Sequence, residues 1–214
     1  MSPGADVYAT AARRGPLVRL ASRRAGEARR RRHEMLFPLT GVTPASRILD
    51  VGSGELGLRA LEPGLDITGV DLTERPGYPG PFVVADASER LPFDDDAFDL
   101  AYCNSVIEHI APRRRAFFAR ELRRVARGWF VQTPAIGFPI DPHSLLPAAH
   151  WLPVALRRPY WRLGAAGTWE EIDLLRRDDM THLFGPPHAE RIGPFTKSWI
   201  SIRAIGAPDP RPRA

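Results

Sequence analysis

The feature that most constrains the fold is a short apolar run that ends in a glycine-rich turn. Residues 47–52 have the sequence RILDVG, and Gly54 and Gly57 follow closely. An apolar run of this length, bounded by glycine, is typical of a strand buried on both faces of a parallel sheet. Glycine also lets a turn approach a ligand closely, so we expect a strand, a ligand-binding turn and then a helix.

Similar short apolar runs recur along the chain and predict further strands. Strands of the central sheet are expected at 47–52, 66–71, 82–85, 98–104 and 128–133. A helix is expected at 112–127, opened by a proline, and a shorter one at 168–177. Residues 189–195 and 197–204 are expected to form two strands joined by a tight turn. Alternation of this kind predicts an α/β sheet that ends in an antiparallel hairpin.

The length of 214 residues favours one domain, which we expect to span 1–206. Within it, 1–45 is a basic helical arm and 134–187 is an apolar, proline-rich insert; 207–214 are expected to be disordered. Six prolines between 134 and 160 exclude long regular elements there. An irregular apolar segment inside a compact domain is more often a binding lid than a linker.

Charge and targeting features narrow the partners. Nine arginines precede His33 in a chain of net charge +5, which suits phosphate groups or an anionic membrane surface, although a solvated helix face is the more ordinary explanation. Few aromatic residues accompany them, so stacking on nucleic acid is not indicated. With one cysteine, no secretion signal and no apolar run near the ~20 residues of a membrane span, a cytoplasmic location is expected.

The spacing of Gly52, Gly54 and Gly57 is that of the dinucleotide fingerprint, and Asp71, at the end of the second strand, is placed to bind a ribose. This pattern alone fits both nicotinamide-dependent enzymes and methyltransferases.

Three further motifs favour a methyltransferase. Asp50 precedes the first glycine by two residues, where a carboxylate suits a sulfonium ligand with a free ammonium better than a pyrophosphate. Asp86 and Ala87 follow the third strand and precede apolar residues at 91–93, a setting that suits an adenine ring and its amino group. Residues 104–109, with the sequence NSVIEH, end the fourth strand.

In this order and spacing, residues 47–133 resemble the class I S-adenosylmethionine-dependent methyltransferases, in the group with the methyltransferase type 11 domain. The resemblance implies a Rossmann-like seven-stranded sheet, mostly parallel, with helices on both faces, and S-adenosylmethionine as the cofactor. It also implies contacts to the cofactor's methionine end by Asp50, Gly52 and Gly54, to the ribose by Asp71, to the adenine by Asp86 and Ala87, and to the ammonium by the backbone carbonyl of Asn104.

Two departures from the family pattern concern the turns beside the cofactor. The third glycine, Gly57, comes three residues after Gly54 rather than two. Residues 73–81 are too short and too rich in proline and glycine for the helix that usually follows the second strand.

The expected function is methyl transfer to a small or lipid-like acceptor, since the insert is apolar and aromatic. A methyltransferase acting on nucleic acid or protein, an inactive cofactor-binding or interaction module and a nicotinamide-dependent oxidoreductase remain the alternatives. Histidine is the usual base near neutral pH, and His109 and His143 are the catalytic candidates. His143 is expected in the acceptor pocket or, equally, as a brace of the insert.

No metal is expected to be required. The chain resembles ubiquinone-type O-methyltransferases at Glu108 and His109, but Ser105 stands where they carry a further carboxylate, and serine is a poor metal ligand. The alternative is that His143 completes a cluster with Glu108 and His109. Nothing in the sequence indicates the oligomeric state.

Overall fold

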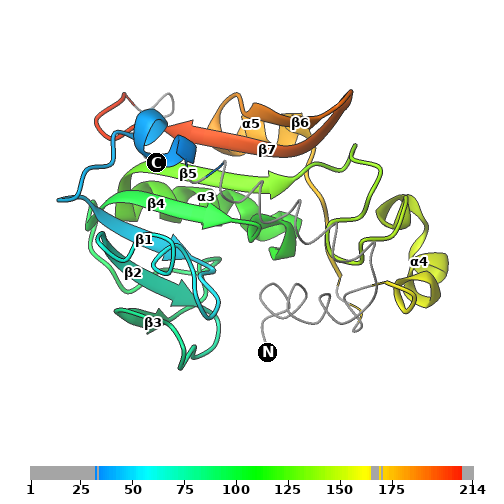
Figure 1. Cartoon of the computed structure of the whole chain (residues 1–214), viewed down its shortest axis with the longest axis horizontal. Coiled ribbons are helices and arrows are strands. Elements are labelled where there is room, and N and C mark those ends of the chain that lie inside the picture. The colour runs from blue at the N-terminus through cyan, green and yellow to red at the C-terminus, as the bar shows by residue number, and fades with distance from the viewer. Residues whose placement is uncertain (1–31, 33, 165–168, 170, 209–214) are drawn as a thin grey trace.

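The computed structural model describes residues 32, 34–164, 169 and 171–208, and a seven-stranded sheet runs through it (Figure 1). The strand order is β3-β2-β1-β4-β5-β7-β6. The strands are β1 (Arg47–Val51), β2 (Asp66–Asp71), β3 (Phe82–Val84), β4 (Phe98–Asn104), β5 (Ala126–Pro134), β6 (His188–Ile192) and β7 (Phe195–Arg203). The predicted Rossmann-like sheet is confirmed, and each predicted strand lies within three residues of its observed ends.

The pairing fixes where a ligand can bind. Strands β1 to β5 pair in parallel, whereas β7 is antiparallel to both β5 and β6, as the predicted hairpin requires. The chain order reverses between β1 and β4, which are neighbours in the sheet. In open α/β sheets the crevice at the carboxyl ends of such strands is the usual ligand site.

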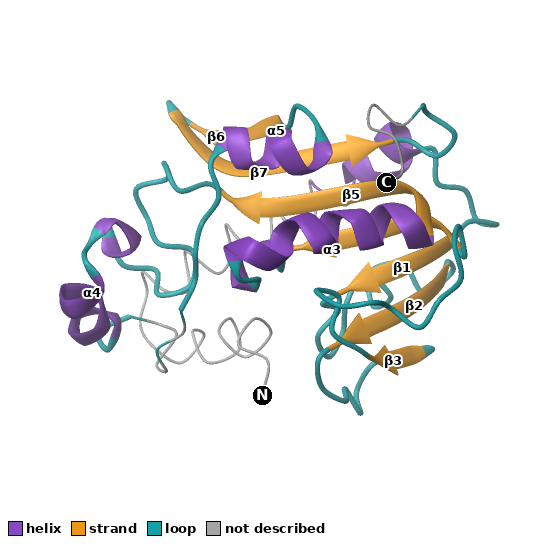
Figure 2. Cartoon of the chain, turned by 180° about the vertical axis from the view of Figure 1, so that it is seen from behind, coloured by secondary structure: helices purple, strands orange, loops and turns teal. Residues whose placement is uncertain are grey.

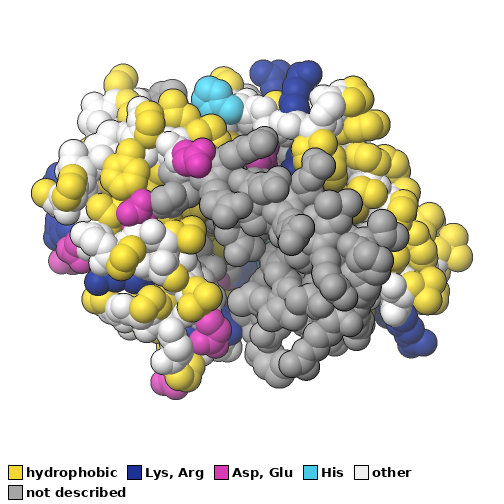
Figure 3. Space-filling model, in the orientation of Figure 1, with side chains coloured by type: hydrophobic (Ala, Val, Ile, Leu, Met, Phe, Trp, Pro, Cys, Tyr) yellow, Lys and Arg dark blue, Asp and Glu magenta, His cyan; other side chains and the backbone are white. Residues whose placement is uncertain are grey.

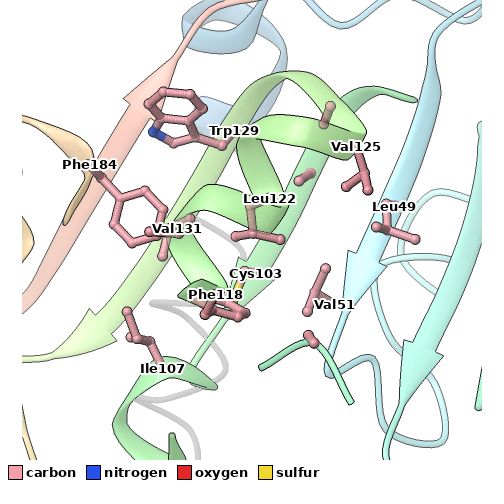
Figure 4. Close-up of a cluster of buried hydrophobic side chains, with 14 of the residues drawn as sticks. Leu49, Val51, Cys103, Ile107, Phe118, Leu122, Val125, Trp129, Val131 and Phe184 are labelled. Carbon is pink, nitrogen blue, oxygen red and sulfur yellow. The ribbon is translucent and has the colours of Figure 1, made fainter. Parts of the chain in front are cut away.

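Helices cover both faces of the sheet, as predicted. On one face lie α3 (Pro112–Val125) and α5 (Arg177–Phe184) (Figure 2). The buried stripe of α3, with Phe118 and Leu122, packs against Val131 of β5 and Phe184 of α5 (Figure 4). On the other face, Leu36 of the helical segment 34–40 joins a second buried cluster with residues of β1, β2, β4 and β5.

Two predicted helices differ from the structure. Residues 54–61 form successive turns, because Gly57 adopts a left-handed φ of 56° that a regular helix does not accommodate. The helix expected at 168–177 instead occupies Arg177–Phe184, where Oδ2 of Asp179 accepts a hydrogen bond of 2.7 Å from the backbone N–H of Arg176 and caps the first turn. Residues 165–168 and 170 lie outside the described part of the chain.

The insert lies beyond the carboxyl ends of β4 and β5 (Figures 1 and 2). It contains η2 (Ala149–Trp151) and α4 (Val154–Trp161) and has a small core in which Trp161, Ile172 and Leu174 are buried. The last part of the expected insert is α5, which belongs to the main core. The described residues contain no helix long and apolar enough to span a membrane. Of the basic arm expected at 1–45, residues 1–31 and 33 lie outside the described part of the chain, as do residues 209–214 of the tail expected at 207–214.

Candidate functional site

The turn after β1 brings the glycines against the segment that follows β4. Gly52 and Gly54 have φ values of 68° and 62°, a left-handed conformation that favours glycine. A Cβ atom on Gly52 would lie 2.3 Å from Cγ2 of Val106, so a larger residue is excluded by close packing as well. The register of β1 with β4 pairs Val51 with Cys103. Gly52 and Asn104 therefore follow at the same level of the sheet.

Asp50 is buried beneath this turn. Its Oδ2 accepts a hydrogen bond of 2.6 Å from the backbone N–H of Leu58. Burial raises the pKa of Asp50 to about 7; the Leu58 hydrogen bond opposes the rise, and the negative charge of Asp71 adds to it. A Cβ atom on Gly57 would lie 2.3 Å from Oδ2 of Asp50, so the third glycine makes room for this carboxylate.

Asp71 ties the glycine turn to the end of β2. Its Oδ2 accepts hydrogen bonds from the backbone N–H of Gly54 at 3.0 Å and from Nε of Arg75 at 3.1 Å, and its Oδ1 accepts one from the N–H of Leu72 at 2.7 Å. Nη2 of Arg75 lies 3.1 Å from Oδ1, which completes a two-pronged ion pair. Arg75 was missed by the sequence analysis, because no regular element between β2 and β3 indicates where its side chain points.

The residues expected to contact the adenine lie apart from this network. Oδ1 of Asp86 accepts a hydrogen bond of 2.8 Å from the N–H of Ser88, and Oδ2 forms a 3.4 Å ion pair with Nη1 of Arg114 on α3. The Asp86 side chain is partly exposed, whereas Ala87 is buried in the main core. The Asp86 carboxylate can therefore be reached by a ligand at the surface, next to the buried apolar side chain of Ala87.

The end of β4 carries a buried amide oxygen. Within the described part of the chain, Oδ1 of Asn104 is buried and accepts no hydrogen bond. The next residue, Ser105, has a left-handed φ of 60°, and its hydroxyl bonds to Oε1 of Gln132 on β5 at 2.9 Å. An acceptor atom without a donor beside Gly52 fits a ligand that carries N–H groups, as the ammonium of S-adenosylmethionine does.

A second cluster lies at the ends of β4 and β5. Glu108, in η1 (Ile107–His109), is fully buried, and its Oε2 accepts a hydrogen bond of 3.0 Å from the hydroxyl of Thr133. Its Oε1 lies 4.0 Å from Nε2 of His143. The His109 and His143 rings meet edge to face, with centroids 5.0 Å apart. The structure thus brings the side chains of Glu108, His109 and His143 together, the grouping that the sequence analysis gave as its alternative.

Burial raises the pKa of Glu108, while His109, the backbone of Glu108, the Thr133 hydroxyl and Arg115 lower it. Arg115 is not a direct partner of this carboxylate. Its guanidinium donates to the carbonyls of Ile110 and Asp173 at 2.9 Å and 2.7 Å. Glu108 is thus a buried carboxylate whose described partners leave part of its charge uncompensated.

Asp141, which the sequence analysis did not single out, holds His143 in place. Its Oδ1 accepts hydrogen bonds from the backbone N–H groups of His143 and Ser144, at 3.0 Å and 2.7 Å, and from the Ser144 hydroxyl at 2.9 Å. Burial would raise the pKa of Asp141, but hydrogen bonds from His150 and Ser144 lower it overall. An aspartate before a proline, here Pro142, is a known turn signal and the clue that the sequence contained.

Comparison with known proteins finds a sequence match for the parallel part of the sheet and not for the insert. Residues 49–130 match the family model described as a methyltransferase domain. The match runs from within β1 to within β5 and leaves His143 and the hairpin outside. No functionally curated protein matches the chain significantly.

Two solved structures share the fold. A protein from Pyrococcus horikoshii OT3 is 18% identical, with 79% of this chain and 85% of that chain covered and a TM-score of 0.58. A SAM-dependent methyltransferase from Methanosarcina mazei is 16% identical, with 77% and 95% covered and a TM-score of 0.50. Residues 49–130 are therefore similar in sequence to a methyltransferase domain, and the chain shares its fold with solved structures that include a SAM-dependent methyltransferase.

Proposed function

We propose that this chain transfers a methyl group from S-adenosylmethionine to a small acceptor that binds between the sheet and the insert. The proposal rests on two buried groups on neighbouring strands, the carboxylate of Asp50 on β1 and the acceptor oxygen of Asn104 on β4. These strands meet where the chain order of the sheet reverses. Both groups suit a cationic ligand with N–H donors.

The cofactor contacts expected from the sequence are retained in this proposal. Asp50, Gly52, Gly54 and Asn104 would hold the methionine end, and Asp86 and Ala87 would hold the adenine. Asp71 would bind the ribose hydroxyls, although Arg75 occupies both of its oxygens. We therefore expect the ribose either to share the carboxylate with Arg75 or to displace it.

The cofactor would supply a methyl group activated by its sulfonium sulfur, and S-adenosylhomocysteine would be the leaving group when the acceptor's nucleophile takes that methyl in line. The protein's main contribution is to align the acceptor, because positioning supplies a large part of the rate in such reactions. Glu108, His109 and His143 lie at the ends of β4 and β5, next to the Gly52 turn that Val106 contacts. We assign them to the acceptor side, where they would handle the proton that an oxygen or nitrogen acceptor loses.

The surface of the insert supports an apolar acceptor. Apolar side chains gather over α4 in Figure 3. The exposed ones on and beside this helix are Trp151, Val154, Leu156 and Leu163. A lipid-like or aromatic acceptor would bind such a surface favourably, because contact removes apolar area on both sides from water. Contact of the basic arm with an anionic membrane would be compatible with this acceptor class.

The experiment is transfer of labelled methyl from S-adenosylmethionine to fractionated cell extracts. We expect label in a lipid or other small-molecule fraction with the wild type. At a cofactor concentration below the Kd, Asp71→Ala should transfer about 10- to 100-fold less label. Label in protein or nucleic acid would favour the macromolecular alternative. Cofactor binding without transfer to any fraction would favour an inactive binding module.

A further inference from the structure

We infer that Glu108, His109 and His143 form a binding site for one divalent transition-metal ion of the zinc class. One ligand atom of each side chain can be chosen so that all three lie within 4.8 Å of one another. Two imidazoles and one carboxylate are the ligand set of several catalytic zinc and non-haem iron sites. Magnesium and calcium prefer oxygen ligands and suit this set poorly.

The buried carboxylate is the strongest reason to place a cation here. Glu108 is fully buried, and its Oε1 accepts no hydrogen bond from the described residues. A buried polar atom without a partner is costly, and a buried charge more so unless it is paired or coordinates a metal. Since the Arg115 guanidinium is engaged by backbone carbonyls, a bound metal would supply the charge that this oxygen lacks.

Hydrogen bonds from outside the cluster fix its members, as is usual around metal ligands. The Thr133 hydroxyl donates to the other oxygen of Glu108 at 3.0 Å. Asp141 accepts the backbone N–H of His143 and so sets where the insert carries that ring. Glu108 and His109, which precede β5 in the sequence, and His143, which follows it, are thereby held close together.

The spacing predicts a small movement on binding. Bonds of about 2.1 Å in a tetrahedron place ligand atoms roughly 3.5 Å apart. The present spread of up to 4.8 Å is larger, so metal binding should draw the insert loop at His143 toward η1. His109 is exposed, which gives an ion access from solvent.

Three protein ligands leave a coordination position open, which is characteristic of catalytic rather than structural sites. An acceptor hydroxyl at that position would lose its proton to solvent more readily, because a bound metal lowers the pKa of an oxygen ligand; with metal bound, the three side chains would act as ligands and not as bases. This role rests on the proposed function, but metal binding itself does not. The proposal and the expectation drawn from Ser105, that no metal is required, predict opposite results.

The test uses the full-length, tag-free protein, stripped with a chelator and dialysed. Titration with Zn²⁺ by calorimetry, and with Co²⁺ by visible absorption, reports stoichiometry, affinity and coordination. We expect one equivalent of Zn²⁺ and the absorption bands of four- or five-coordinate Co²⁺. His109→Ala, a surface change, and Glu108→Gln should weaken Zn²⁺ binding more than about 100-fold, the upper end of what changes around the ligands cost. Thr133→Val should weaken it about 10- to 100-fold.

The control is His188→Ala, which removes an exposed histidine on β6 and should leave Zn²⁺ affinity unchanged. S-adenosylhomocysteine binding is measured on every variant to verify the fold and to separate this proposal from the proposed function. The metal site would be overturned if the wild type bound the cofactor but took up no Zn²⁺ or Co²⁺. It would also be overturned if His109→Ala and His188→Ala bound Zn²⁺ with equal affinity. Metal binding without cofactor binding would support the site and contradict the proposed function.

Discussion

Oε1 of Glu108 and Nε2 of His143 lie 4.0 Å apart, although one residue precedes β5 in the sequence and the other follows it. Glu108 is fixed by the sheet, through Thr133, whereas His143 is fixed by the turn that Asp141 organises in the insert. The acceptor side of the site therefore depends on how the insert packs against the sheet. The proposed cofactor side depends on the ends of β1 to β4 and not on the insert.

Asp141→Ala is expected to loosen the insert without unfolding the domain. It leaves the backbone N–H groups of His143 and Ser144 without their acceptor, and the buried one, of Ser144, costs about 1–3 kcal/mol. Hydrogen–deuterium exchange should show faster exchange at residues 143–151 and unchanged protection in β1 and β4. Loss of protection across the whole sheet would instead make Asp141 essential to the global fold.

Gly57→Ala is expected to destabilise the protein more than Gly41→Ala does. Both glycines have a left-handed φ, of 56° and 72°, but an added Cβ meets Oδ2 of Asp50 at 2.3 Å only in the first; at Gly41 nothing lies within 4 Å. The shared backbone strain costs about 1–3 kcal/mol, and overpacking at Gly57 adds about 1–3 kcal/mol. Equal midpoints of chemical denaturation for the two variants would show that the Asp50 contact is unimportant.

Cofactor affinity is expected to rise with pH up to about 7 and then level off. The pKa of Asp50 is raised to about 7 in the free protein, so below this pH the carboxyl is largely protonated. A bound cation favours the ionised form, so binding releases a proton, and affinity falls by up to about tenfold per pH unit below the pKa. Calorimetry between pH 5.5 and 8 checks this; Asp50→Asn should flatten the profile, and a flat wild-type profile would remove Asp50 from the site.

The same shift predicts an opposite effect on the stability of the ligand-free protein. The pKa of Asp50 is higher in the folded state than its ordinary value of 3.8, so the folded state holds the proton more tightly. This contribution to stability is fully present below about pH 3.8 and is lost as pH rises toward 7. Denaturation of wild type and Asp50→Asn at pH 5 and pH 8 measures it; the stability difference between the proteins should change with pH.

Asp71→Ala is expected to weaken S-adenosylhomocysteine binding by one to two decades. Loss of a charge-assisted hydrogen bond costs about 1.5–3 kcal/mol, and 1.4 kcal/mol corresponds to a factor of about ten. Asp66→Ala, at the opposite end of β2, is the matched control and should bind normally. If Arg75 merely blocks the carboxylate, Arg75→Ala should bind at least as tightly as wild type. Unchanged affinity in Asp71→Ala would exclude it as the ribose anchor.

The strands were predictable because each is a short apolar run that ends at glycine, proline or a polar residue, as at Val51 and Asp71. The segment after β1 was less predictable, since the left-handed Gly57 replaces a regular helix with turns and its missing Cβ leaves room for the carboxylate of Asp50. The start of α5 is capped by the hydrogen bond from Arg176 to Asp179. Acidic residues earlier in the chain could have capped a helix as well, so the sequence did not distinguish between the two starting points.

The site was predictable where its residues follow strands. Asp50, Asp71 and Asn104 each stand at or near the end of a parallel strand, so topology alone brings them to one edge. The meeting of His143 with Glu108 was given from the sequence only as an alternative, because it depends on the path of the insert, which hydrogen bonds to Asp141 determine. The engagement of Asp71 by Arg75 was hidden for a related reason: no regular element lies between β2 and β3 to indicate side-chain direction.

The most direct test of the central claim is calorimetric titration of S-adenosylhomocysteine into the metal-free wild-type chain, with reduced nicotinamide dinucleotide titrated in parallel. Asp50, the Gly52 turn and Asn104 predict saturable binding of one S-adenosylhomocysteine per chain, weakened in Asp71→Ala and retained in Asp66→Ala. They predict no saturable heat with the nicotinamide. Binding of the nicotinamide dinucleotide, with none of S-adenosylhomocysteine, would contradict the assignment of this edge to a sulfonium cofactor.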